Sequence, residues 1–137
     1  MGVTVLWENE THHWRGSVDE TSGRMVVDGD EVAAATGWTL QARGLCRGEV
    51  CIPLAGRALT DDEGRLDLGA LCDVLDRPWL VDPTRAVAAV GVPRATRRAA
   101  LTDRRAPDLE LTDLEGRSRR LEEFAGRRRL LVAFASW

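Results

Sequence analysis

The sequence of 137 residues has no lysine and no tyrosine, and it has only three cysteines and two phenylalanines. It also lacks any apolar run near the ~20 residues that a membrane-spanning helix needs. Its first ten residues, MGVTVLWENE, have no basic stretch followed by an apolar one, as a secretory signal would. Three cysteines do not make a disulfide framework. These absences predict a cytoplasmic protein with no membrane partner.

The composition is that of a globular protein. Hydrophobic residues make up 44% and charged residues 30% of the chain, which is typical of folded domains rather than of disordered or fibrous chains. The length suffices for one core of ordinary size, or for a small domain and part of another. All 19 basic residues are arginine, which we interpret as the residue usage of a GC-rich bacterial genome.

The charge is unevenly distributed along the chain. Residues 1–93 carry eight arginines against 15 acidic residues, whereas residues 94–137 carry eleven against seven. The arginines of this second part are interrupted by aspartate and glutamate, so they predict a solvated surface rather than a nucleic-acid site. We therefore expect no nucleic-acid partner.

Short strands are expected in the first 92 residues. β-branched or aromatic runs at 3–7 and 25–27 predict two of them, with polar residues between that interrupt the pattern. Residues 78–81 and 86–92, on either side of Asp82-Pro83-Thr84, predict a closing hairpin.

Two helices are expected in the same region. One covers 31–36, with Asp30 as its N-cap and Gly37 just after its end. The other is capped by Asp67, and its apolar residues recur at helical spacing. They are Leu68, Leu71, Cys72 and Leu75. This spacing makes Cys72 a core residue, and we expect four tryptophans, Trp7, Trp14, Trp38 and Trp79, to pack the same domain.

Cys46 and Cys51 are expected on the two strands of a hairpin within 38–54, with Arg47-Gly48 at the turn. With a two-residue loop at Arg47-Gly48, the two cysteines are diagonal neighbours. If the loop takes in all four residues between them, they lie directly opposite, at a separation that a disulfide can bridge. In both cases they share one face of the hairpin.

A different pattern begins at residue 106. A Pro-Asp pair is followed by alternating leucines, a turn, a short amphipathic segment, an apolar strand and the tripeptide Ala-Ser-Trp. These features are Pro107-Asp108, Leu109 and Leu111, Asp113 to Gly116, Leu121 with Phe124, Leu130 to Phe134, and Ala135-Ser136-Trp137. By itself this order predicts a β-hairpin that leads into a buried central strand.

Residues 106–137 resemble the start of the redoxin group, which includes alkyl hydroperoxide reductase/thiol-specific antioxidant proteins and TlpA-like thiol oxidoreductases. The resemblance implies a thioredoxin-like fold whose nucleophilic cysteine directly follows Trp137, at a helix N-terminus that lowers its pKa. No catalytic residue of that kind is then expected within the 137 residues. For the complete protein the resemblance implies no cofactor, and as partner a thiol reductant such as thioredoxin or a small thiol.

Three explanations for the end at Trp137 are open: a chain cut deliberately, a frameshift or nonsense truncation, or a UGA codon for selenocysteine read as a stop. The third is consistent with bacterial redoxins that resemble this chain and carry selenocysteine at that position. A selenol is ionised at neutral pH, whereas a thiol of pKa ~8.5 needs help from its surroundings. Without later strands beside it, the apolar segment 130–134 is expected to aggregate or capture a partner, or to pack on the N-terminal domain.

The remaining chemical candidates are Cys46 and Cys51. They are either a redox pair that exchanges with the nucleophile expected after Trp137, or small residues that pack a hairpin. A zinc site with His12 or His13 is a further alternative, although the cysteine spacing departs from a zinc knuckle and adjacent histidines on a strand point to opposite faces. We expect no metal.

The sequence thus predicts an α+β protein with three parts: a small α+β domain over 1–92, an Arg-rich linker over 93–105, and the truncated start of a thioredoxin-like domain over 106–137. The functional hypothesis is the N-terminal portion of a thiol- or selenol-dependent redoxin, which reduces peroxides or exchanges disulfides when complete and is inactive as given. The alternative is a self-sufficient binding or adaptor domain, in which Cys46 and Cys51 are a structural or redox-sensing pair.

Overall fold

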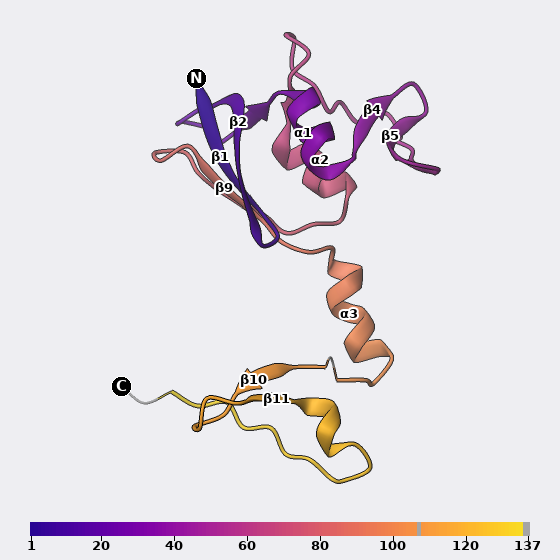
Figure 1. Ribbon diagram of the computed structural model, residues 1–137. Coiled ribbons are helices and arrows are strands. Elements are labelled where there is room, and N and C mark those ends of the chain that lie inside the picture. Colours follow the sequence, from indigo (N-terminus) through magenta and orange to yellow (C-terminus); the bar gives the residue numbers. More distant parts are fainter. Residues whose placement is uncertain (107, 136–137) are drawn as a thin grey trace. The chain divides into compact units, whose positions relative to one another are not determined.

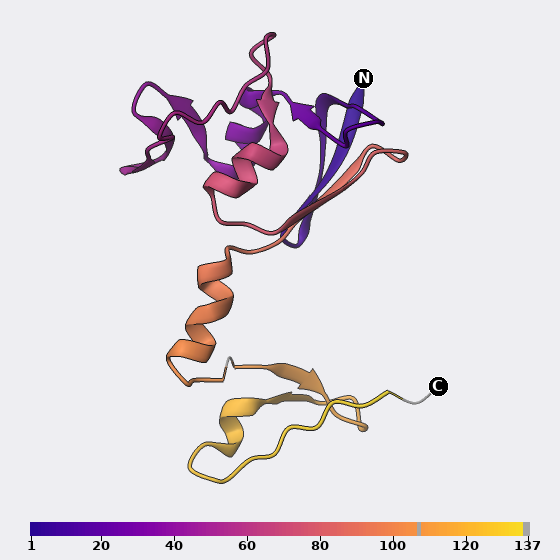
Figure 2. The same ribbon diagram turned by 180° about the vertical axis from the view of Figure 1, so that it is seen from behind.

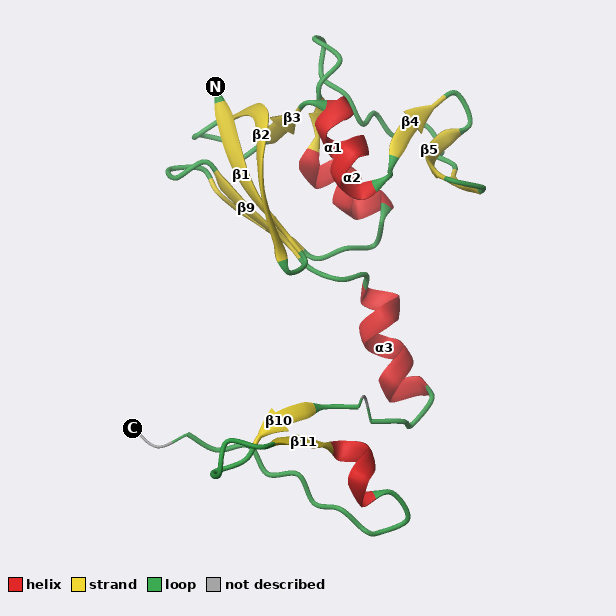
Figure 3. Ribbon diagram, in the orientation of Figure 1, coloured by secondary structure: helices red, strands yellow, loops and turns green. Residues whose placement is uncertain are grey.

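The computed structural model describes residues 1–106 and 108–135 and has a mixed α+β fold (Figure 1, Figure 3). The chain forms two compact units, Met1–Arg98 and Ala99–Trp137. Among the described residues, no helix is long and apolar enough to cross a membrane.

The first unit is built on a six-stranded sheet of order β7-β3-β2-β1-β9-β8. Its strands are β1 (Gly2–Trp7), β2 (Glu10–Val18), β3 (Met25–Val27), β7 (Leu66–Asp67), β8 (Trp79–Asp82) and β9 (Val87–Val90). The pairing is antiparallel except between β1 and β9, which are far apart in sequence and run side by side in both views (Figure 1, Figure 2). The closing hairpin predicted around Asp82 is present as β8 and β9.

Strand β2 corrects the prediction from the sequence. The polar residues between 7 and 25 were expected to interrupt the strands, but several of them lie within β2. Around Trp14 the side chains of this strand alternate between the two faces of the sheet, so that Trp14 is buried while its neighbours His13 and Arg15 are exposed. Trp14 pairs with Val3 of β1 in the antiparallel register. Polar residues on one face of a half-exposed strand are compatible with pairing, because side chains alternate between faces.

Two helices pack on one face of this sheet, α1 (Gly29–Thr36) and α2 (Leu68–Val74) (Figure 3). Asp67 caps α2 as predicted, since its carboxylate accepts from Ala70 N at 3.0 Å. The N-cap of α1 is Asp28 rather than Asp30, and it accepts from Asp30 N at 2.9 Å. Gly37 ends α1 in the left-handed conformation, as expected.

The core lies between these helices and the sheet. It combines sheet residues with the predicted apolar face of α2, namely Val3, Val5, Trp7, Trp14, Met25, Val27, Leu66, Ala88 and Val90 with Leu68, Leu71, Cys72 and Leu75. Trp7, Trp14 and Trp38 are buried as expected, but Trp79 is 39% exposed. Trp79 lies over Gly69 of α2 and donates its indole N–H to Asp73 Oδ1 at 3.0 Å, so it covers the helix from outside.

A second sheet of three strands, β4 (Thr39–Gln41), β5 (Gly44–Arg47) and β6 (Val50–Ile52), follows α1 in the sequence. The predicted hairpin is present, but its turn is Gly48-Glu49 rather than Arg47-Gly48, because Arg47 pairs with Val50. Gly48 has φ 57°. That value suits the first central position of a two-residue hairpin turn, where glycine is preferred.

Helix α3 (Arg94–Thr102) occupies most of the segment that the sequence predicts as an Arg-rich linker. The division between the two units falls within α3.

The second unit begins with the predicted hairpin, formed by β10 (Glu110–Thr112) and β11 (Ser118–Arg120). Asp113 closes the turn by accepting from Glu115 N at 3.0 Å and from Arg117 N at 2.8 Å. A 3₁₀ turn, η1 (Leu121–Phe124), follows where the sequence predicts an amphipathic helix.

The predicted apolar strand over 130–134 is wrong for this structure. The segment forms no strand, and Leu130 and Phe134 are 90% and 89% exposed. A strand needs a hydrogen-bonded neighbour, and no strand of the described chain pairs with this segment. Ala135 is described and exposed, whereas Pro107, Ser136 and Trp137 lie outside the described residues.

Candidate functional site

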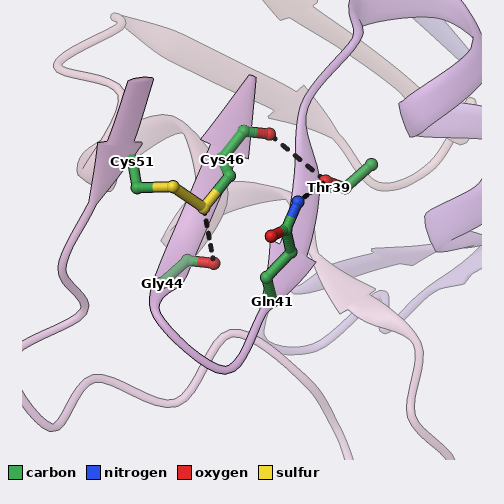
Figure 4. Close-up of a disulfide and its surroundings, with 5 residues drawn as sticks. All are labelled: Thr39, Gln41, Gly44, Cys46 and Cys51. Atoms are coloured by element: carbon green, nitrogen blue, oxygen red, sulfur yellow. Dashed lines mark hydrogen bonds between the residues drawn. A yellow bond between two sulfur atoms is a disulfide. The ribbon is translucent and has the colours of Figure 1, made fainter. Parts of the chain in front are cut away.

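Cys46 of β5 and Cys51 of β6 are joined by a disulfide bond across the hairpin (Figure 4). Because the turn is Gly48-Glu49, the two residues are direct cross-strand partners and their Cα atoms are 4.1 Å apart. This short spacing is typical of a non-hydrogen-bonded pair, where facing side chains approach most closely. Of the two geometries open from the sequence, the structure therefore has the directly opposed one.

The backbone that brings the sulfur atoms together depends on Gly44. Gly44 has φ 131°, and a Cβ atom there would lie 2.1 Å from the carbonyl oxygen of Ile52. No other residue type fits this close approach of β5 to the end of β6. The Gly44 carbonyl oxygen in turn lies 3.8 Å from Cys46 Sγ, within reach of a thiol proton when the disulfide is reduced.

The face that carries the disulfide is polar and uncharged beside Cys46. Thr39 of β4, the cross-strand partner of Cys46, donates its hydroxyl to the Cys46 carbonyl oxygen at 3.3 Å. Gln41 donates its amide to Thr39 Oγ1 at 3.0 Å, and Figure 4 shows both side chains on the side of Cys46 away from Cys51. Sequence analysis missed Thr39, Gln41 and Gly44, since only the register reveals them.

The opposite face of the hairpin contacts the core of the first unit. Arg47 follows Cys46 on β5 and so points to the other face, where its guanidinium lies 4.7 Å from the ring centroid of Trp38. Trp38 and Leu45 are both buried in the core. A cation placed over an indole is attracted by about 0.5–1 kcal/mol at exposed sites. Cys46 of the disulfide therefore lies on β5, and packing in the core fixes the position of this strand.

The two cysteines of the disulfide differ in burial. Cys46 is 1% exposed, whereas Cys51 lies on β6 and is half-buried. Attack on a disulfide requires access to one of its sulfur atoms. The pair therefore joins one buried residue to one that is only partly buried.

Cys72 is a different kind of cysteine. It is fully buried on the inner face of α2, as the helical spacing predicts, and it forms no disulfide. Burial raises the pKa of the Cys72 thiol to about 12. Because the thiolate is the reactive form, Cys72 is inert at neutral pH.

The two histidines contact other residues of the six-stranded sheet. His12 stacks on Trp14 with ring centroids 5.3 Å apart, and His13 lies 3.2 Å from Thr4 Oγ1 on the other face of β2. Within residues 1–106 and 108–135, no three His, Cys, Asp or Glu side chains come close enough together to hold a metal ion. The zinc alternative therefore has no ligand cluster in the described chain.

In the second unit, the motif residue Asp108 connects the start of the hairpin to its end. It accepts from Arg120 Nε at 2.9 Å and from Glu122 N at 3.2 Å. The hydrogen bond from Arg120 holds the pKa of Asp108 below its usual range. Asp108 thus holds the two ends of the hairpin together. These contacts indicate a structural role rather than a catalytic one.

A groove of about 350 Å³ runs along the same hairpin. Its lining is mostly leucine with arginine at the rim: Leu109, Leu111, Leu121, Phe124, Leu130 and Leu131 with Arg119, Arg120 and Arg129. The groove brings together the apolar positions of the redoxin-like motif. It contains no nucleophile or base that could carry out a reaction.

Comparisons of the chain with protein-family models, with curated proteins and with solved structures found no match. The resemblance to redoxins therefore rests on the motif in 106–137 alone. Any function for the first unit has to be argued from the geometry around Cys46 and Cys51.

Proposed function

We propose that Cys46 and Cys51 are a reversible dithiol–disulfide pair within the N-terminal portion of a thiol- or selenol-dependent redoxin. One observation carries the first part: the two cysteines are bonded to each other on a hairpin, and Cys51 is only partly buried. The sequence predicts a cytoplasmic protein, and disulfides in that compartment are mostly transient or redox-sensing. A pair that opens and closes fits this setting better than a permanent staple.

The redoxin part of the proposal is supported by the hairpin of the second unit. β10, the Asp113 turn, β11 and η1 occur in the order that the motif predicts, and their apolar side chains gather in one groove. In the complete protein, Cys46 and Cys51 would pass electrons from a thiol reductant, such as thioredoxin or a small thiol, to the oxidised form of a nucleophile after Trp137. The complete protein would then reduce peroxides or exchange disulfides.

Each part has its own test. For the pair, the native chain is incubated with thioredoxin or with glutathione, and released thiols are counted by alkylation and mass spectrometry. We expect two thiols to appear without unfolding and to disappear again on oxidation.

For the redoxin part, peroxidase and insulin-reduction activity are compared with and without the coding region downstream of Trp137, and we expect activity only in the longer form.

The alternative, a binding or adaptor domain with a structural pair, is favoured by one observation. The first unit has a complete core of its own, and β5 joins it through Leu45. On this hypothesis the disulfide only fixes the hairpin, and it resists glutathione in the native state. The thiol count therefore separates the two functions.

A further inference from the structure

The strand that carries Cys51 is at the edge of its sheet. The order β4-β5-β6 places β5 in the middle, and no described strand pairs with the outer side of β6. Cys46 lies on the middle strand, with β4 on one side and β6 on the other. The disulfide therefore runs from the centre of the sheet to its open edge (Figure 4).

This direction matters because a thiolate attacks a disulfide in line with the bond that breaks. Attack on Cys46 Sγ would come from the side of β4, where Thr39 and Gln41 stand and are hydrogen-bonded to each other (Figure 4). Attack on Cys51 Sγ would come from beyond β6, where no neighbouring strand lies in the described chain. The position of the disulfide in the sheet thus makes the two sulfur atoms unequally open to attack, in addition to the difference in burial of the two residues.

The backbone of Cys51 adds to this asymmetry. In a non-hydrogen-bonded pair, the N–H and C=O groups of each residue point away from the partner strand. The 4.1 Å Cα separation identifies Cys46 and Cys51 as such a pair. The Cys51 backbone therefore presents a donor and an acceptor at the open edge, where an extended segment of a protein thiol can pair with β6.

Resting on the proposed function, we propose that Cys51 is the sulfur that an incoming thiolate attacks, and that Cys46 is the sulfur released. The attacking thiolate forms a bond to Cys51 Sγ, the bond between the two cysteines breaks, and its electron pair leaves on Cys46, which takes a proton from water. The Cys46 thiol can then donate to the Gly44 carbonyl oxygen. A second thiolate attacks the sulfur of the bound reductant and releases Cys51, so the reductant is oxidised to a disulfide and two thiols remain on the chain.

The test uses glutathione as the probe. In C46S the free thiol is Cys51, and in C51S it is Cys46, so each variant reports one position and cannot close the disulfide again. We expect oxidised glutathione to modify C46S at least about tenfold faster than C51S, because reactivity follows access. The double variant C46S/C51S is the matched control, and its rate measures any reaction of Cys72.

A measurement on the unchanged chain covers the case in which a variant fails to fold. The oxidised chain receives reduced glutathione, the reaction is quenched with acid, and peptide mapping locates the adduct. Adduct on Cys51 is the expected result. Equal adducts, or adduct mainly on Cys46, would overturn the assignment of Cys51 while leaving the reversible pair intact. If glutathione forms adducts only with the urea-unfolded chain, the reversible pair itself is wrong and the assignment fails with it.

Discussion

The two units use similar sequence patterns and reach different degrees of burial. In Met1–Arg98, alternating strands and amphipathic helices face one another, so that Val5, Leu68 and Leu71 are completely buried. In Ala99–Trp137, the alternating leucines lie on a two-stranded hairpin and Leu111 stays 60% exposed. Pattern alone does not bury a side chain, because a sheet needs a second layer against its apolar face. The first unit has that layer in α1 and α2.

The two units also differ in the chemical groups that they carry. The core of the first unit fixes β5, and β5 fixes Cys46 opposite Cys51. The second unit holds the motif that resembles redoxins, but its described residues supply an apolar groove rather than a reactive group. The chain therefore combines a disulfide held by a packed core with a motif whose described residues carry no reactive group.

The largest contrast is expected for leucines in the two units. Leu71→Ala should lower the free energy of unfolding by about 2–5 kcal/mol, because it leaves a cavity in a closed core. Leu111→Ala should change it by less than about 0.5 kcal/mol, since the side chain is mostly exposed. Urea titrations of both variants measure the difference. Equal effects would show that the hairpin of the second unit is buried in solution.

The next effect concerns the backbone beneath the disulfide. Gly44→Ala should destabilise the chain by at least about 1–3 kcal/mol, since backbone strain is added to a clash with the Ile52 carbonyl. Gly48→Ala, at a turn with nothing near the added methyl group, should lose only about 1–2 kcal/mol. Thermal unfolding of the two variants ranks them. The reverse order would contradict the register described for β5 and β6.

Capping should distinguish the units by a smaller amount. Asp67→Ala removes the N-cap of α2 and the ion pair with Arg24, and should lower stability by about 0.5–2 kcal/mol. Asp108→Ala removes an exposed ion pair with Arg120, which is worth about 0–1 kcal/mol. Urea midpoints provide the comparison. An Asp108 variant that unfolds at a lower urea concentration than the Asp67 variant would contradict this ranking.

The smallest effect is a pH dependence at the β8–β9 turn. The Thr84 hydroxyl and the Arg85 side chain donate hydrogen bonds to the carboxylate of Asp82 and lower its pKa to about 2, with the larger effect from Thr84. The pKa is lower in the folded than in the unfolded chain, so this contribution is complete above pH ~4 and is lost as pH falls towards 2. The protection of the Thr84 and Arg85 amides, relative to the unfolded chain at the same pH, should fall over that range. In Asp82→Asn the same amides should show no such step.

Sequence reasoning was most accurate where local chemistry dominates. The Asp67 cap, the core face of α2 with Cys72, the closing β8–β9 hairpin and the Asp113 turn were all predicted from residues close together in the chain. Caps and turns are satisfied within a few residues, so their signals are readable without the fold.

The errors arose where tertiary pairing decides. β2 forms through polar residues because β1 and β3 pair with it, and the segment 130–134 stays open because no described strand does. The turn at Gly48-Glu49 differs from the predicted one by one residue. Cys46 lies opposite Cys51, which is one of the two geometries that the sequence leaves open. Cys46 and Cys51 were identified as candidates from the sequence. Their disulfide bond and their unequal burial are revealed only by the structure.

The most direct test of the account is the reduction potential of Cys46–Cys51 in the native chain, measured by equilibration with glutathione buffers and counting of free thiols. A reversible pair should titrate between about −270 and −120 mV, the range of thiol–disulfide oxidoreductases. A midpoint below about −300 mV is the behaviour of a structural disulfide. That result would contradict the proposed redox function and favour the adaptor domain.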